Sequence, residues 1–168
     1  MRIFSHRSDR LHRLAYSSRT AGAPDIRSSG LTRSDAGARA LVAAGAEPYH
    51  GTIDDPESLR AGAAAADAVI HTAFDHNFAN FAANCEKDQR VIRSLSDALK
   101  GSAKPLVITS GTGMGTSKPG QPATEDVFDA DNPNPRKASN GPAPRCWPSA
   151  SRSSSCGCRR FMIRASRA

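Results

Sequence analysis

The chain has 168 residues, of which 38% are hydrophobic and 5% aromatic, and no apolar run approaches the roughly 20 residues that span a bilayer. The N-terminus also lacks the apolar stretch of a signal peptide. We therefore expect a cytoplasmic protein with a single domain and no membrane partner. The formal net charge of +7 comes from Arg2 and from residues 5–30 (+3) and 140–168 (+6), while residues 31–139 carry −3, so it does not indicate a nucleic-acid partner.

The first regular unit of the middle segment is a strand end, a helix and a helix stop. Residues 31–32 end the strand, and the Ala-rich stretch 36–44 follows, with Ser34 or Asp35 in the position of an N-cap. Gly45 comes next, and glycine commonly ends a helix because it adopts the left-handed conformation without strain. The pattern therefore predicts a strand followed by a capped helix.

Three further strands and two helices follow in alternation. The predicted strands are residues 47–50, 68–71 and 105–109, and the last two are apolar runs typical of strands that are covered on both faces. The predicted helices are residues 56–65, with a proline in the first turn, and residues 78–99, whose apolar side chains recur every three or four positions. This alternation predicts an α/β, Rossmann-like doubly wound parallel sheet with right-handed crossovers.

Three stretches of the middle segment have the order and spacing of a known family. They read TRSDAGARAL, GTIDDPESLRAGAAAADAVIHTAF and PLVITSGTG. They resemble the NAD-dependent epimerase/dehydratase branch of the extended and atypical short-chain dehydrogenase/reductase family, and the resemblance extends over residues 31–139. It implies a dinucleotide-binding domain over residues 1–139 and the activity of an NAD(P)-dependent oxidoreductase, epimerase or dehydratase on a small-molecule substrate.

The resemblance assigns roles to residues at the carboxyl ends of the predicted strands, where ligands of doubly wound sheets bind. His71, Thr72 and Ala73 correspond to the segment that lies against the cofactor. Ser110 corresponds to a catalytic hydrogen-bond donor to the substrate oxygen. For His71, the alternative is a strand-end histidine whose hydrogen bonds are satisfied within the protein.

The resemblance also places two residues against the adenosine half of the cofactor. Arg33 follows the second strand, where the family reads the adenosine ribose, and a basic residue there suits a 2′-phosphate, so NADP is favoured over NAD. The alternative for Arg33 is a solvated surface arginine. Thr52 stands where many relatives have an Asp that contacts adenine, so we expect the neighbouring Ile53 to pack on adenine instead.

Two departures from the family pattern bear on activity. Asn132 and Arg136 fall where the family has its Tyr and Lys, and neither supplies the phenol of lowered pKa that general acid catalysis requires. The glycine-rich fingerprint is absent after residues 1–4, because residues 5–10 read SHRSDR. We therefore expect NADP (or NAD) to bind weakly. A non-catalytic dinucleotide-binding or regulatory protein is the alternative to an enzyme.

Both ends of the chain have the composition of out-of-frame translation. Codons permitted for residues 5–14 spell VTGATGFIGS, a fingerprint of the family, when they are read one base later, and codons from Ser139 onward permit a helix and a buried strand in the other frame. We therefore expect residues 5–30 to be aberrant, residues 140–168 to be a disordered Arg/Ser/Cys-rich tail, and the chain to be truncated with an incomplete sheet. Two tail cysteines one residue apart are too close for a zinc half-site, so no metal is expected.

Overall fold

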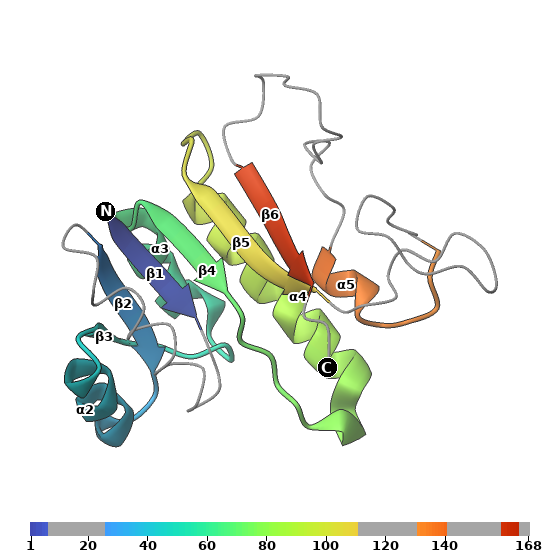
Figure 1. Ribbon diagram of the computed structural model, residues 1–168. Helices are drawn as coiled ribbons and strands as arrows, with labels where there is room; N and C mark the ends of the chain where they lie inside the picture. Colours follow the sequence, from blue (N-terminus) through green and yellow to red (C-terminus); the bar gives the residue numbers. More distant parts are fainter. Residues whose placement is uncertain (7–25, 111–130, 141–158, 165–168) are drawn as a thin grey trace.

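The computed structural model describes residues 1–6, 26–110, 131–140 and 159–164, and its strands form one sheet (Figure 1). The strands are β1 (Arg2–His6), β2 (Arg27–Thr32), β3 (Glu47–His50), β4 (Ala68–His71), β5 (Pro105–Ser110) and β6 (Arg159–Arg164). Every neighbouring pair is parallel, and the order across the sheet is β3-β2-β1-β4-β5-β6. The chain therefore forms the doubly wound α/β sheet that the alternation of strands and helices predicts.

The helices confirm the local patterns of the sequence. They are α2 (Asp35–Ala43), α3 (Arg60–Ala65), α4 (Phe81–Ala98) and α5 (Lys137–Asn140), with the 3-10 turns η1 (Pro56–Leu59) and η2 (Phe78–Asn80) in front of α3 and α4. Ser34 Oγ caps α2 by accepting a hydrogen bond from the N–H of Gly37 at 3.2 Å, and Gly45 follows the helix with φ of 76°. None of the described helices is both long and apolar enough to cross a membrane.

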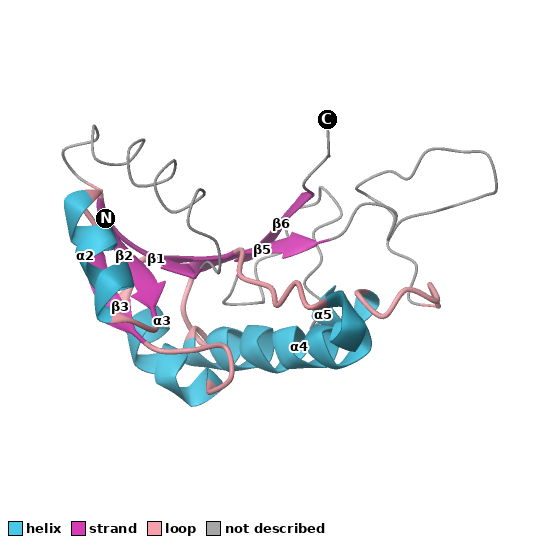
Figure 2. Cartoon of the chain, turned by 90° about the horizontal axis from the view of Figure 1, so that it is seen from below, coloured by secondary structure: helices cyan, strands magenta, loops and turns pink. Residues whose placement is uncertain are grey.

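Helices pack on both faces of the sheet. Neighbouring residues of a strand point to opposite faces, so each strand can contact helices on both sides. Gly30 of β2 faces α2, and a Cβ on it would lie 2.5 Å from Leu41 Cδ2, so glycine allows α2 to come close. Leu31 points the other way, into the core that also contains Leu59 of η1. Figure 2 shows α3 and α4 lying together along that second face.

The core lies between the sheet and the helices α3 and α4. Its fully buried apolar side chains are Phe4, Leu59, Val69, Val91, Leu95, Leu99, Leu106 and Ile108. Gly62 lets α3 approach, since a Cβ there would lie 2.9 Å from the ring of Phe4. This packing fixes the strands in a register that brings their carboxyl ends together at one edge, with Thr32 opposite His50 and His71 opposite Ile108.

Several parts of the segments that we expected to be aberrant belong to strands or helices. Residues 5–6 end β1, and residue 140 ends α5. Residues 27–30 belong to β2 and pair with both β1 and β3, and Arg159–Arg164 forms β6 beside β5. The expectation of a disordered tail is therefore corrected for residues 159–164, because backbone hydrogen bonds to a neighbouring strand require little of the side chains. Residues 7–25, 141–158 and 165–168 lie outside the described residues, and so does the expected site of the glycine fingerprint beyond His6.

Candidate functional site

The carboxyl edge of the sheet is the candidate site. In the order β3-β2-β1-β4-β5-β6, the chain runs outward from β1 in one direction and returns to continue from β4 in the other. The crevice that such a switch creates is where open α/β sheets bind ligands. The short helix α5 packs against α4, and Arg136 in front of it reaches the end of β5 (Figure 1).

A buried carboxylate, Asp88 of α4, lies at the end of β4. Its Oδ1 is 2.7 Å from Nε2 of His71, and the two side chains are only 3% and 2% exposed. An ionised carboxylate can only accept hydrogen bonds, so the imidazole donates its Nε2–H. The His71 ring is therefore held in a fixed orientation at the end of its strand by a partner 17 residues away in the sequence.

Arg136, just before α5, completes the buried network. One guanidinium nitrogen, Nη1, donates to Asp88 Oδ2 at 2.8 Å and to Ser139 Oγ at 2.9 Å, and Nη2 donates to the carbonyl of Thr109 at 3.1 Å. The guanidinium also stacks over Phe74, with 3.9 Å between its carbon and the ring centroid. Arg136 thus joins the end of β5, the segment after β4 and helix α4.

The charges around Asp88 decide its protonation. Burial by itself raises the pKa of Asp88, because a carboxylate loses its hydration in the protein interior. The charge and hydrogen bond of His71, the charge of Arg136 and a hydrogen bond with Ser139 outweigh burial and hold the pKa of Asp88 below its ordinary value. Asp88 is consequently ionised at neutral pH, and removing either partner would leave a buried charge or donor without compensation.

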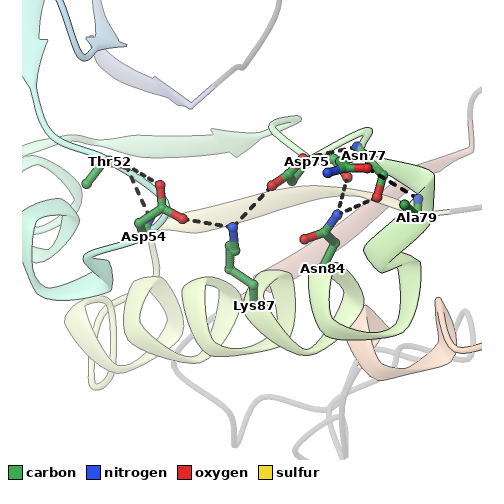
Figure 3. Close-up of polar contacts among 7 residues, drawn as sticks. All are labelled: Thr52, Asp54, Asp75, Asn77, Ala79, Asn84 and Lys87. Carbon is green, nitrogen blue, oxygen red and sulfur yellow. Dashed lines mark hydrogen bonds and ion pairs between the residues drawn. The ribbon is translucent and has the colours of Figure 1, made fainter.

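A second charged cluster connects two loops at the same edge (Figure 3). Lys87 Nζ lies 2.8 Å from Asp54 Oδ1, in the loop after β3, and 3.1 Å from Asp75 Oδ2, in the loop after β4. Its hydrogen bond lowers the pKa of Asp54, and the pKa of Asp75 is lowered first by the backbone N–H of Asn77 and then by Lys87. The same contacts, led by Asp54, raise the pKa of Lys87, so all three groups are charged at neutral pH.

The sequence-predicted cofactor residues lie along this edge. Arg33 directly follows β2 and is exposed, and Ile53 is partly buried against the core in the loop after β3. Thr72 and Ala73 directly follow β4, half-buried and buried respectively, and Ser110 is the last residue of β5. The structure thus brings the predicted residues to one edge, and their roles toward a cofactor or substrate stay predictions.

Asn132 and Arg136, which the sequence resemblance aligns with a Tyr and a Lys, differ in what they contact. Asn132 is buried, and its Oδ1 accepts a hydrogen bond from the backbone N–H of Asn134 at 3.0 Å. Arg136 reaches the carboxyl edge and is held there by Asp88 and Thr109. Across the part of the chain that the structure describes, no three His, Cys, Asp or Glu side chains come together as a metal site.

Sequence reasoning missed Asp88 and Lys87. The signal for Asp88 is its position in the apolar stripe of α4, because Phe81, Cys85, Asp88, Ile92 and Leu95 recur every three or four residues. A carboxylate on the buried face of a helix is uncommon and normally has a partner. Lys87 has no such signal, since a lysine next to that stripe has the pattern of an ordinary solvent-exposed residue.

Two curated fungal proteins are similar to the chain in sequence, and no family model matches it. Protein C2A9.02 of Schizosaccharomyces pombe, described as uncharacterized, is 42% identical over 108 residues, which cover 64% of this chain and 36% of that protein. Protein YLL056C of Saccharomyces cerevisiae, also described as uncharacterized, is 40% identical over 85 residues, or 49% of this chain and 28% of that protein. The chain thus matches about a third of the length of these relatives.

Solved structures are similar to the chain in fold. The triphenylmethane reductase of Citrobacter sp. complexed with NADP(H) matches 68% of this chain and 39% of its own, with a TM-score of 0.54 and 21% identity. The fold is Rossmann-like. The NADPH-dependent quinone oxidoreductase of Escherichia coli, complexed with NADPH, matches 67% of this chain and 37% of its own, with a TM-score of 0.50 and 18% identity. Both neighbours were solved with the cofactor bound, NADP(H) in the first and NADPH in the second.

Proposed function

We propose that this domain binds NADP(H) at the carboxyl edge of its sheet and belongs to an oxidoreductase of the extended short-chain dehydrogenase/reductase type. The observation that carries the proposal is the strand order, which reverses between β1 and β4, the position at which open α/β sheets bind ligands. The similarity to two reductases solved with bound NADP(H) or NADPH supports it. Epimerase or dehydratase chemistry is the further possibility that the sequence resemblance offers within the same proposal.

The side chains at the edge suit the adenosine half of the cofactor. The exposed cation of Arg33 follows β2, where it would meet a 2′-phosphate, which favours NADP over NAD. Ile53 offers apolar surface for adenine from the loop after β3, and the buried Ala73 would support the loop after β4 behind the cofactor. His71 and Thr72 would complete the wall at the end of β4, and the ring of His71 is held by Asp88.

The site lacks the sequence that normally binds the pyrophosphate of the dinucleotide. In this fold, backbone N–H groups of a glycine-rich loop and the N-terminus of the first helix bind the pyrophosphate. Here the residues after β1 read RSDR, and they lie outside the described residues. We therefore propose weak binding of NADP, supported mainly by the adenosine contacts.

The residues near the reacting end favour impaired chemistry. NADPH supplies a hydride when bound, and Ser110 at the end of β5 would donate a hydrogen bond to the substrate oxygen. Arg136 is permanently protonated and is already held by Asp88, so it cannot take over proton transfer from the missing phenol. This observation favours a second candidate, a non-catalytic dinucleotide-binding or regulatory protein.

Cofactor titration tests the proposal. Arg33→Ala should lower the affinity for NADP⁺ about tenfold and leave the affinity for NAD⁺ nearly unchanged, because only NADP⁺ carries the 2′-phosphate. Arg39→Ala, which removes an exposed arginine on α2, is the matched control and should change neither affinity. No binding of either dinucleotide at millimolar concentration would refute the proposal.

Turnover separates the two candidate functions. Oxidation of NADPH in the presence of carbonyl or quinone substrates would support the reductase, and cofactor binding without turnover would support the non-catalytic alternative. We further propose a small-molecule substrate and a cytoplasmic location, with no nucleic-acid or membrane partner. A binding constant for nucleic acid that falls steeply with salt would contradict the partner proposal.

A further inference from the structure

Lys87 of α4 is the contact that joins the loop after β3 to the loop after β4. Its ammonium reaches Asp54 at 2.8 Å and Asp75 at 3.1 Å, from below the carboxyl edge (Figure 3). Lys87 is 24% exposed, while the side chains of Asp54 and Asp75 are 55% and 35% exposed. The pairs are thus partly hydrated, and their contribution to overall stability is small.

Each carboxylate is also tied to the backbone of its own loop. Asp54 Oδ2 accepts a hydrogen bond from the hydroxyl of Thr52 at 3.2 Å, and Thr52 Oγ1 accepts one from the N–H of Asp54 at 3.2 Å. Asp75 Oδ1 accepts a hydrogen bond from the N–H of Asn77 at 3.1 Å. Fixing the two carboxylates therefore fixes the course of both loops as well as the two side chains.

Other residues hold each loop separately. Asn84 of α4 donates to the carbonyls of Asp75 and Asn77, at 3.2 and 2.9 Å. The hydroxyl of Ser94 donates to the carbonyl of Pro56, just past the loop after β3, at 3.0 Å. Replacing Lys87 would therefore leave both loops attached to α4 and would remove the contact that sets one loop relative to the other.

The two loops carry residues of the proposed adenosine site, the partly buried Ile53 and the buried Ala73. Ile53 immediately precedes Asp54, and Ala73 lies two residues before Asp75. Without the ammonium, two carboxylates would face each other next to this site, and their repulsion would separate the loops and oppose the phosphates of a dinucleotide. The length of the Lys87 side chain and its positive charge therefore both set the distance between the two loops.

We infer that Lys87 is a positioning residue that sets the spacing between Ile53 and Ala73 and thereby the affinity for the adenosine half of the dinucleotide. The inference rests on the proposed function. In this proposal Lys87 acts through Asp54 and Asp75 in the two loops that it contacts, and no direct contact with the cofactor is invoked.

Three variants test the inference in the full chain. Lys87→Met keeps the length and apolar stem of the side chain and removes its charge, Lys87→Arg keeps the charge, and Lys100→Met removes an exposed lysine near the end of α4 as a matched control. Calorimetric titration with NADP⁺ and with 2′,5′-ADP should show affinities lowered at least about fivefold in Lys87→Met and within about twofold of the unaltered chain in the other two variants.

Amide hydrogen exchange supplies a readout that does not need the nucleotide. Peptides covering residues 51–55 and 74–80 should exchange faster in Lys87→Met, while the core strands should keep their protection. Equal NADP⁺ affinity in the unaltered chain and in Lys87→Met would overturn the positioning role alone. Absence of NADP⁺ binding by the unaltered chain would overturn the proposed function and the positioning role with it.

Discussion

Replacement of Asp88 by Ala is the sharpest test of the buried network. The carboxylate receives hydrogen bonds from His71 Nε2 at 2.7 Å and from Arg136 Nη1 at 2.8 Å, and the arginine side chain is only 12% exposed. Asp88→Ala leaves that guanidinium charge nearly buried and without its counterion. Breaking a buried pair from one side costs about 3–5 kcal/mol, a large part of the roughly 5–15 kcal/mol that stabilises a domain.

Two further variants separate charge from shape. Asp88→Asn keeps the volume of the side chain, but its amide NH₂ group faces one of the two donors, so we expect a loss of about 1.5–3 kcal/mol. Asp97→Ala removes an exposed carboxylate from the same helix and should change the free energy of unfolding by less than about 0.5 kcal/mol.

Urea denaturation at pH 7, followed by circular dichroism, measures these differences. A fall of less than about 1 kcal/mol in the free energy of unfolding of Asp88→Ala would show that Asp88 does not compensate a buried charge on Arg136. A double variant that also replaces Arg136 by Leu should lose less than the sum of the two single losses, because the uncompensated charge is gone.

Further outcomes follow from the same structure. The pKa values of Asp54, Asp75 and Asp88 lie below the ordinary 3.8 in the folded chain, so their contribution to stability is present above that pH and is lost as the pH falls below it. Denaturation curves between pH 7 and 3 should show this decline, with a smaller decline in Asp88→Asn. Leu95→Ala, at a fully buried core position, should cost about 2–5 kcal/mol in the same assay. Most of residues 5–14 lie outside the described residues. Replacing them by VTGATGFIGS should raise the affinity for NADP⁺ at least about tenfold, or 1.4 kcal/mol. Micromolar binding of NADP⁺ by the unaltered chain would contradict the expected lack of a pyrophosphate-binding loop.

The elements of the middle segment could be predicted because their signals are local. Ser34 and Gly45 mark the two ends of α2, and both act on backbone groups within a few residues of themselves. The predicted helices 56–65 and 78–99 are present, and each begins with a 3-10 turn, a detail that periodicity does not distinguish from an α-helical first turn. The strand β6 could not be predicted, because its partner β5 lies far away in the sequence.

The edge at which the site lies was also within reach of the sequence. Parallel strands place their carboxyl ends on the same side, so the positions of Arg33, Ile53 and Ala73 at that edge follow from the order of strands and helices. What each side chain contacts there did not follow. The buried partner of His71 is an example, since the sequence left open whether that ring is held within the protein or turned toward a ligand.

The sequence by itself determined the strands and helices of the middle segment, their caps and the doubly wound parallel architecture, because hydrophobic period and capping are properties of neighbouring residues. Only the tertiary structure decided which charges meet. Asp88 joins His71 and Arg136, which lie 17 and 48 positions from it, and Lys87 joins loops that follow two different strands. These contacts exist because α4 packs across the sheet and carries its polar residues to the strand ends, a placement that depends on the packing of the whole core.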